Sequence, residues 1–203
     1  GEEPAKTFIR QALEAGKHVF VEKPLALTVA DCEEICAKAE ESGRLLTVGF
    51  NRRFAPHMQS ARPAFLDAAA PRMILYRCNA GPLPPGHWAT DPVEGGGRII
   101  GECVHFYDLC CWLLDAAPVA VRAERVAGSG ADVVPEDNLT TLLRFPDGSL
   151  ATIVYCSVGH PGIPKERAEM YGGTGGIVID DYRSMVFAGL PGKTVRKGRQ
   201  DKG

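Results

Sequence analysis

Two short segments hold residues whose types and spacing could do chemistry. In the first, Glu22, Lys23 and Pro24 follow residues 18–21, a β-branched and aromatic run that is typical of a strand. Open α/β sheets bind ligands at the carboxyl ends of their strands, which is where this lysine would lie. Its ammonium group could hold a substrate hydroxyl or stabilise a developing alkoxide. The alternative interpretation is a solvated Lys-Pro turn.

In the second segment, His105 and Asp108 are three residues apart and would share one face of a helix. They follow three glycines, residues 95–97, which would let the backbone approach a ligand closely. A histidine paired with a carboxylate could shuttle a proton near neutral pH. The alternative is a half-buried histidine at the start of a helix, with an aspartate on the side of that helix.

Two other segments resemble binding motifs but have simpler explanations. Residues 172–176 are rich in glycine, yet a strand-like run follows them where a phosphate loop needs a helix, so they predict a hairpin. The basic residues among positions 193–202 have no interleaved aromatic residues, and we interpret them as a solvated segment that binds no nucleic acid.

The hydrophobic pattern predicts the elements that position these segments. Residues 6–15 are expected to form a helix that ends at Gly16, and Thr28 begins a second helix that Gly43 ends. With strands at 18–21 and 45–50, this gives a strand–helix–strand unit at the edge of a doubly wound sheet. The later elements are helices at 57–69 (interrupted at Pro63) and 103–114, and strands at 73–79, 119–126, 138–145, 149–157, 167–171 and 176–180.

Consecutive strands with short turns favour an antiparallel sheet. We therefore predict an α/β fold followed by an α+β fold. Residues 1–50 would be the remnant of a Rossmann doubly wound sheet that binds a dinucleotide. Residues 51–203 would form an open, mostly antiparallel sheet with helices on one face.

The composition is that of an ordinary globular protein and excludes several classes. The 203 residues carry a formal net charge of −2, 45% hydrophobic residues and seven cysteines. No apolar run reaches the ~18 residues that cross a bilayer, so no membrane partner is expected. An odd number of cysteines without a CxxC pair favours reduced thiols and a cytoplasmic protein, and no spacing indicates a metal site.

Three separated motifs resemble the glucose–fructose oxidoreductase / inositol 2-dehydrogenase / MocA (Gfo/Idh/MocA) family. They cover residues 11–25, 48–56 and 95–108, and they occur in the order that the family has. The resemblance covers nearly the whole chain. Residues 84–88 and 164–167 are most similar to the branch whose members can carry a fused region like a zinc alcohol dehydrogenase.

The resemblance implies an NAD- or NADP-dependent oxidoreductase that transfers a hydride between nicotinamide and a sugar, sugar nucleotide or cyclitol. It implies a homo-oligomer that associates through the C-terminal sheet. It also assigns roles by position: Lys23 and His105 would be catalytic, Glu22, Lys23 and Arg53 would bind the cofactor, and Trp88 and Asp108 would bind the substrate.

The chain departs from the family pattern in two places. Gly101 stands four residues before His105, where the family has an aspartate, and we expect Glu102 to point elsewhere on the helix. The GxGxxG loop that holds the cofactor pyrophosphate is absent from these 203 residues. We therefore expect an interior part of a longer protein that is inactive by itself.

The alternative function is a non-catalytic carbohydrate-binding or oligomerisation module. A Lys23→Ala change in the whole protein discriminates the two functions. Sugar binding and activity that both survive the change would favour the module.

Overall fold

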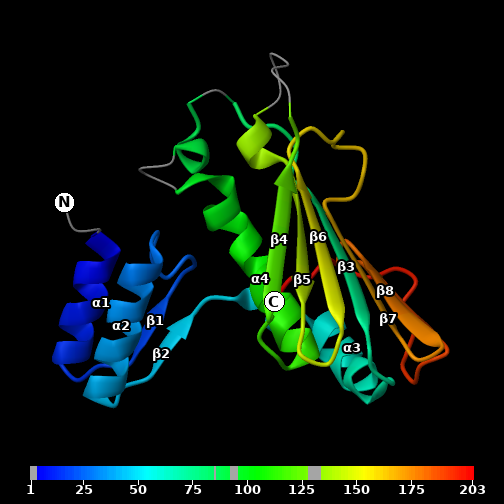
Figure 1. Ribbon diagram of the computed structural model, residues 1–203, viewed down its shortest axis with the longest axis horizontal. Helices are drawn as coiled ribbons and strands as arrows, with labels where there is room; N and C mark the ends of the chain where they lie inside the picture. Colours follow the sequence, from blue (N-terminus) through cyan, green and yellow to red (C-terminus); the bar gives the residue numbers. More distant parts are fainter. Residues whose placement is uncertain (1–3, 85, 92–95, 128–133) are drawn as a thin grey trace.

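The computed structural model describes residues 4–84, 86–91, 96–127 and 134–203. Figure 1 shows a small N-terminal unit beside a large sheet that has helices on one face. The small unit consists of α1 (Pro4–Glu14), β1 (Val19–Val21), α2 (Val29–Ser42) and β2 (Leu46–Val48). Its two strands pair in parallel, as predicted, with Val19 opposite Leu46.

The ends of α2 form where the sequence predicts them. The Thr28 hydroxyl accepts a hydrogen bond from the Asp31 backbone N–H at 3.1 Å, which caps the start of the helix. Gly43 ends the helix in the left-handed conformation, with φ of 62°. A small core holds the two helices against the strands, and it consists of Ile9, Leu13, Ala26, Ile35 and Ala39.

The large sheet has the strand order β4-β5-β6-β3-β7-β8-β9. The strands are β3 (Met73–Asn79), β4 (Ala120–Arg125), β5 (Leu139–Arg144), β6 (Leu150–Cys156), β7 (Glu166–Gly172), β8 (Gly175–Asp180) and β9 (Ser184–Ala188). Every pair is antiparallel except β3 with β6, which is parallel. The expectation of a mostly antiparallel sheet is confirmed, and the glycines of residues 172–176 form the β7–β8 hairpin.

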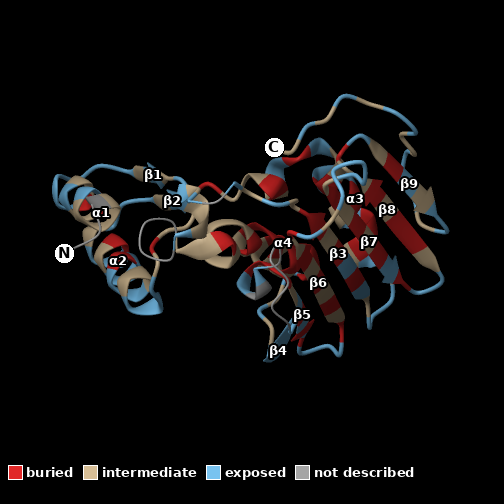
Figure 2. Ribbon diagram, turned by 90° about the horizontal axis from the view of Figure 1, so that it is seen from above, coloured by how far each residue is buried: buried red, intermediate tan, exposed pale blue. Residues whose placement is uncertain are grey.

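Two helices, α3 (Pro56–Asp67) and α4 (Val104–Leu114), cover one face of this sheet (Figures 1 and 2). Alternate residues of each central strand point into the core, as Ile74 and Tyr76 do on β3. The Tyr76 ring stacks on Phe106 of α4 at a centroid distance of 4.6 Å. Short helical turns connect the elements: a 3₁₀ turn at Asn51–Phe54, a 3₁₀ turn at Trp88–Thr90, a π-helical turn at Ile99–Cys103, and a 3₁₀ turn at Pro135–Asp137.

Three expectations need correction. Pro63 lies inside an unbroken α3, because buried residues on both sides of it, Met58 and Phe65 among them, hold the helix to the sheet. Strand β9 was not predicted, although it pairs with β8 over five residue pairs. The basic tail is not wholly solvated, since the Lys202 ammonium lies 2.6 Å from the Glu166 carboxylate.

Glu166 is the centre of a buried polar network that joins distant elements. Its carboxylate is fully buried and accepts two hydrogen bonds from the Arg52 guanidinium, at 3.0 and 3.1 Å. The Tyr76 hydroxyl donates to it at 2.5 Å. Burial alone would raise the pKa of Glu166, but Arg52 and the hydrogen bonds lower it to about 2. The network therefore fixes the turn after β2 to the start of β7.

We predict that Glu166→Gln destabilises the fold by about 3–5 kcal/mol, because it leaves the buried Arg52 charge without a carboxylate. Urea denaturation of the purified protein measures the loss. Glu169→Gln is the matched control: Glu169 pairs with Arg167 on the outer face of the sheet, where an ion pair contributes about 0–1 kcal/mol.

The pH dependence of the same measurement has a defined sign. A carboxyl whose pKa falls from 4.5 to about 2 on folding stabilises the fold above pH 4.5, and this stabilisation is lost as the pH falls towards 2. The wild-type chain should lose more stability than Glu166→Gln over that interval. Equal losses would contradict this role of Glu166.

Candidate active site

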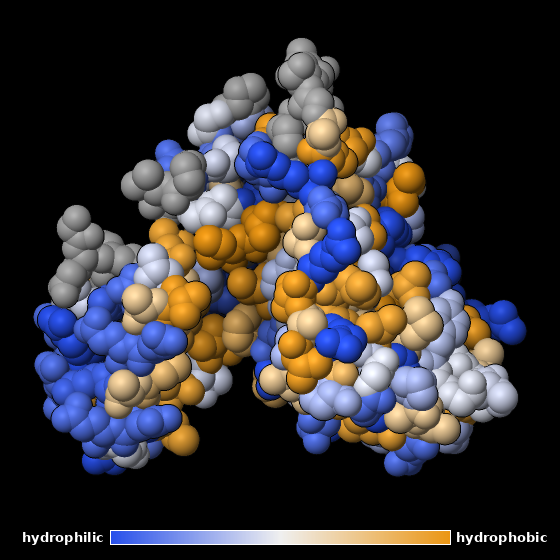
Figure 3. Space-filling view, in the orientation of Figure 1, coloured by the Kyte–Doolittle hydropathy of each residue, from blue (hydrophilic) through white to orange (hydrophobic). Residues whose placement is uncertain are grey.

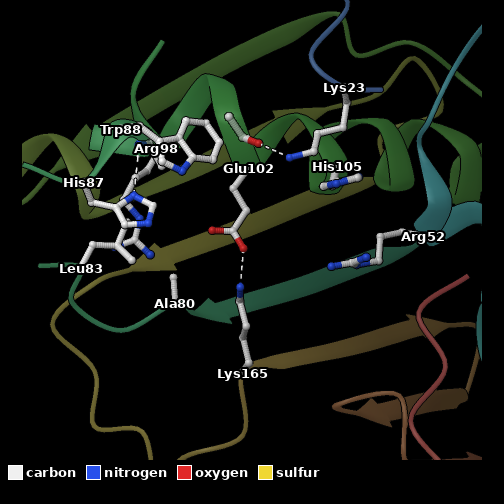
Figure 4. Close-up of a pocket in the computed structure, with 12 residues that line it drawn as sticks. Lys23, Arg52, Ala80, Leu83, His87, Trp88, Arg98, Glu102, His105 and Lys165 are labelled. Atoms are coloured by element: carbon white, nitrogen blue, oxygen red, sulfur yellow. Dashed lines mark hydrogen bonds and ion pairs between the residues drawn. The ribbon is translucent and has the colours of Figure 1, made fainter. Parts of the chain in front are cut away.

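A cavity of about 360 Å³ lies between the small unit and the large sheet, beside the π-helical turn Ile99–Cys103. Figure 3 shows apolar side chains gathered in the hollow between the two units, and Figure 4 shows the polar residues inside. The walls come from the segment after β1, the turn after β2, the loop after β3, the π-helical turn with the start of α4, and the residue before β7. The lining residues are Lys23, Arg52, Ala80, Leu83, His87, Trp88, Ala89, Arg98, Gly101, Glu102, His105 and Lys165.

Lys23 reaches this cavity from the carboxyl end of β1, where the sequence places it. The Lys23–Pro24 peptide bond is cis. The ammonium group donates a hydrogen bond to the Gly101 carbonyl at 2.5 Å. Burial lowers the pKa of Lys23, and the nearby Glu102 carboxylate opposes that shift. The lysine is thus held by a neutral partner and keeps donors for a ligand.

Glu102 lies in the π-helical turn Ile99–Cys103. It lines the cavity together with Lys23 and His105, so the expectation that it points elsewhere on a helix is wrong. Glu102 stands three residues before His105, a spacing that puts two side chains on one face of a helix. Turns of the π type are frequent at functional sites. The Glu102 carboxylate accepts hydrogen bonds from Tyr155 and from Lys165, each at 2.5 Å. Burial raises its pKa, but these two partners lower it more, so Glu102 is ionised at neutral pH.

His105 lies on the first turn of α4 and is 7% exposed. Its Nδ1 atom has no hydrogen-bond partner. Burial and, to a smaller extent, the positive charges of Arg52 and Lys23 together lower the pKa of the imidazole to about 4. The ring is therefore neutral at physiological pH and can accept a proton.

The pairing of His105 with Asp108 that the helical spacing suggests is not formed. Asp108 instead binds the guanidinium of Arg53, with Nε 2.6 Å from Oδ2 and a second contact between Nη2 and Oδ1. Neither Arg53 nor Asp108 is among the residues that line the cavity or its neighbour described below. His105 and Asp108 lie about one helical turn apart on α4. The ion pair with Arg53 directs the Asp108 side chain towards the turn after β2.

A second cavity of about 460 Å³ adjoins the carboxyl ends of β1 and β2. Its walls include Glu22, Asn51, and the exposed rings of Phe20 and Phe54. The carboxylate of Glu22 lies against Gly49, where a Cβ would stand only 2.8 Å from its Oε2. The absence of a side chain at position 49 thus makes room for this carboxylate.

The two cavities share two residues, Lys23 and His105. Each side chain can therefore face one molecule in the first cavity and another in the second. Catalysis of a transfer between two bound molecules needs this arrangement, because the reacting atoms must be held about 3–3.5 Å apart.

Trp88 stands at the rim of the first cavity and is 60% exposed, with His87 stacked on it at 5.7 Å between ring centroids. An exposed aromatic face of this kind can pack against a sugar or cyclitol ring. The site thus brings together Lys23, His105 and Trp88, and it places Glu22 in the adjoining cavity.

The sequence analysis assigned no site role to Arg52, Arg98 or Lys165, although all three line the first cavity. Arg98 is buried, donates to the Gly81 carbonyl at 2.7 Å, and lies 3.9 Å from Asp137. Lys165 lies in a segment that was noted only for its resemblance to one branch of the family. The available signal was their position: Arg52 and Arg98 lie inside two of the recognised motifs, and Lys165 lies inside the segment 164–167.

Within the described ranges, no group of three or more His, Cys, Asp or Glu side chains is placed to hold a metal ion. The helices of those ranges are all too short or too polar to cross a membrane.

Comparison with known proteins identifies two family regions. Residues 4–50 match an oxidoreductase family with an NAD-binding Rossmann fold, and residues 42–178 match the GFO/IDH/MocA C-terminal domain. The chain is 36% identical over 69% of its length to the 1,5-anhydro-D-fructose reductase of Ensifer adhaerens, and it covers 43% of that protein. It is 31% identical over 86% of its length to the scyllo-inositol 2-dehydrogenase (NAD(+)) of Bacillus subtilis, of which it covers 52%.

A solved structure supports the fold. The inositol dehydrogenase homologue from Azotobacter vinelandii, complexed with NAD+, superposes with a TM-score of 0.79 at 21% identity, over 95% of this chain and 54% of that one. The chain spans about half the length of the curated relatives it matches. The family match extends over most of the described sheet and the small parallel unit, so the chain belongs to the Gfo/Idh/MocA family of oxidoreductases.

Proposed function

We propose that the whole protein is an NAD(P)-dependent dehydrogenase that transfers a hydride between nicotinamide and a hydroxyl-bearing carbon of a sugar, sugar nucleotide or cyclitol. The observation that carries this proposal is the pair of adjoining cavities that share Lys23 and His105. The relatives named above act, by their names, on anhydrofructose and scyllo-inositol. Residues 1–50 would belong to the dinucleotide-binding domain, and residues 51–203 to the substrate domain.

The second cavity suits the nicotinamide end of the cofactor. It lies at the carboxyl ends of parallel strands, where dinucleotides bind in doubly wound sheets. The Glu22 carboxylate would accept hydrogen bonds from ribose hydroxyls, and Phe20 offers an exposed apolar surface. When bound, the nicotinamide supplies or receives the hydride.

The residues of this chain would handle the substrate hydroxyl. Lys23 would donate a hydrogen bond to the hydroxyl oxygen and stabilise its negative charge as it develops. His105, which lines the cavity, would receive the hydroxyl proton on its imidazole ring during oxidation and return it during reduction. Arg53 and Asp108, which bind each other, would fix the turn after β2 to α4, and we propose no direct contact of either with ligands.

We also propose that copies of the protein associate through the outer face of the large sheet. This face is not covered by α3 or α4 and carries a row of apolar side chains that are 37–48% exposed: Met73, Leu75, Leu142, Tyr171 and Val186. Exposed apolar side chains gathered on one face of a sheet are typical of an interface. A second copy of the same sheet is the matching partner.

Lys23→Met should lower kcat/KM of the whole protein by about 10²–10⁴-fold, because it removes the donor to the reacting hydroxyl. The absorbance of reduced nicotinamide reports turnover with a panel of sugars and cyclitols. Lys17→Met, at an exposed lysine of the same unit, is the control and should leave the rate unchanged. If the wild-type protein turned over none of the panel with either cofactor, the proposal would fail.

His105 should remain neutral until the pH approaches 4, because burial disfavours the imidazolium. NMR of the histidine ring nitrogens measures this titration, and His105→Gln assigns the signal. The unfolded chain binds this proton at higher pH than the folded chain, so His105 lowers stability as the pH falls from 6.5 to 4. A midpoint at or above 6.5 would contradict the burial of a neutral ring.

Leu142→Arg should shift the protein to a smaller species in sedimentation velocity, because it places a charge in the apolar row. The control is Val29→Arg on α2, where an apolar residue that is 74% exposed, against 37% for Leu142, lies away from the sheet. An unchanged assembly in Leu142→Arg would exclude this face as the interface.

A further inference from the structure

The first cavity is lined by more positively than negatively charged side chains. Among its described lining residues, four side chains are permanently or usually cationic: Lys23, Arg52, Arg98 and Lys165. The same lining has one carboxylate, that of Glu102. Because His105 is neutral at physiological pH, it does not change this balance.

Further carboxylates lie behind the cavity wall and balance part of this charge. Glu166 pairs with Arg52 and with Lys202, and Lys202 also lies 3.8 Å from Asp181. Asp137 lies 3.9 Å from Arg98. In the part of the chain that the structure describes, Lys23 makes no ion pair: its ammonium donates to a carbonyl, and the Glu102 and Glu22 carboxylates act on it only through their field. The excess of positive charge thus belongs to the lining of the cavity itself.

Lys165 is the cation that a ligand can reach most easily. Its side chain is 42% exposed, whereas those of Arg52 and Arg98 are 11% and 4% exposed. In Figure 4 Lys165 extends into the middle of the cavity, opposite Lys23. Glu102 holds it there at 2.5 Å. The two arginines lie at the edges and act on a ligand through their field.

We propose that the substrate of this cavity carries an anionic substituent, a carboxylate or a phosphate, that binds beside Lys165. This inference rests on the proposal that the cavity holds the substrate. A neutral polyol would bind through hydrogen bonds alone and would gain nothing from a net positive charge of the cavity lining. A cleft lined mainly by one sign of charge instead concentrates ligands of the opposite sign and strengthens their binding. Lys23 remains available for the reacting hydroxyl, because Lys165 lies on the other side of the cavity.

The test compares ligands that differ only in charge. Calorimetry on the whole protein, without cofactor, measures binding of D-glucuronate, D-glucose 6-phosphate and D-glucose. We expect at least one anion to bind about tenfold more tightly than glucose, as unit charges a few ångströms apart in a partly buried site imply. The preferred anion distinguishes a carboxylate from a phosphate substituent. The preference should weaken at high salt.

Two variants of the same ion pair should change this preference in opposite directions. Lys165→Met removes a positive charge and should reduce the preference for the anion about fivefold or more, whereas Glu102→Gln removes the negative charge and should increase it. A merely structural ion pair predicts the same direction for both variants, because either change breaks it. Lys165→Arg keeps the charge and should keep the preference.

The exposed pair Lys38 and Glu41 on α2 provides matched controls, and neither Lys38→Met nor Glu41→Gln should alter the preference. Equal binding of glucose and both anions, binding of none of them, or a common direction for the two variants would overturn the inference. These readouts do not depend on hydride transfer. A charge preference in a protein without turnover would reject the proposed function while leaving the anion site in place.

Discussion

The site depends on the hydrogen bond between the Lys23 ammonium and the Gly101 carbonyl, which are 78 positions apart in the chain. Lys23 belongs to the small parallel unit, and Gly101 to the π-helical turn that leads into α4. This contact joins the two walls between which both cavities lie. Gly101 has no side chain to stand between the lysine and the turn. Where the family resemblance implies an aspartate, this chain has a glycine whose carbonyl accepts from Lys23, and the neighbouring Glu102 is the carboxylate that lines the first cavity.

The buried Arg52–Glu166 pair supports that contact from behind. It ties the turn after β2 to the first residue of β7, next to Lys165, so the small unit and the far wall of the cavity share one anchor. The same arginine contributes to the low pKa of His105. A single buried charge thus fixes geometry and also adds to the effect of burial that keeps the proposed base neutral.

Local patterns in the sequence were sufficient to predict most elements. Caps at Thr28 and Gly43 and the alternation along the later strands act over a few residues, so they can be recognised without the fold. The motif residues Lys23, His105 and Trp88 also line the first cavity. Helical spacing failed for Asp108, because the partner that determines its direction, Arg53, comes from a different segment.

Most of the residues that sequence reasoning missed depend on long-range contacts. Glu102 is the exception, because it stands three positions before His105 and helical spacing alone puts the two side chains on one face. Lys165 meets Glu102 across 63 positions, and Arg52 meets Glu166 across 114. Both ion pairs form only when the chain folds, and no local pattern in the sequence indicates them.

The position of β3 links the formation of the site to the completion of the sheet. Strands β5 and β6 form a hairpin that is local in sequence, and so do β7 and β8, whereas β3 must enter between them from about 77–98 positions away. Ala80 follows β3, Glu102 binds Tyr155 of β6, and Lys165 precedes β7, so each adjoining strand supplies one part of the cavity wall. The cavity cannot exist in a partly assembled sheet. A folding intermediate that has only the two hairpins would carry the binding residues without a binding site, so ligand binding would report the docking of a single central strand.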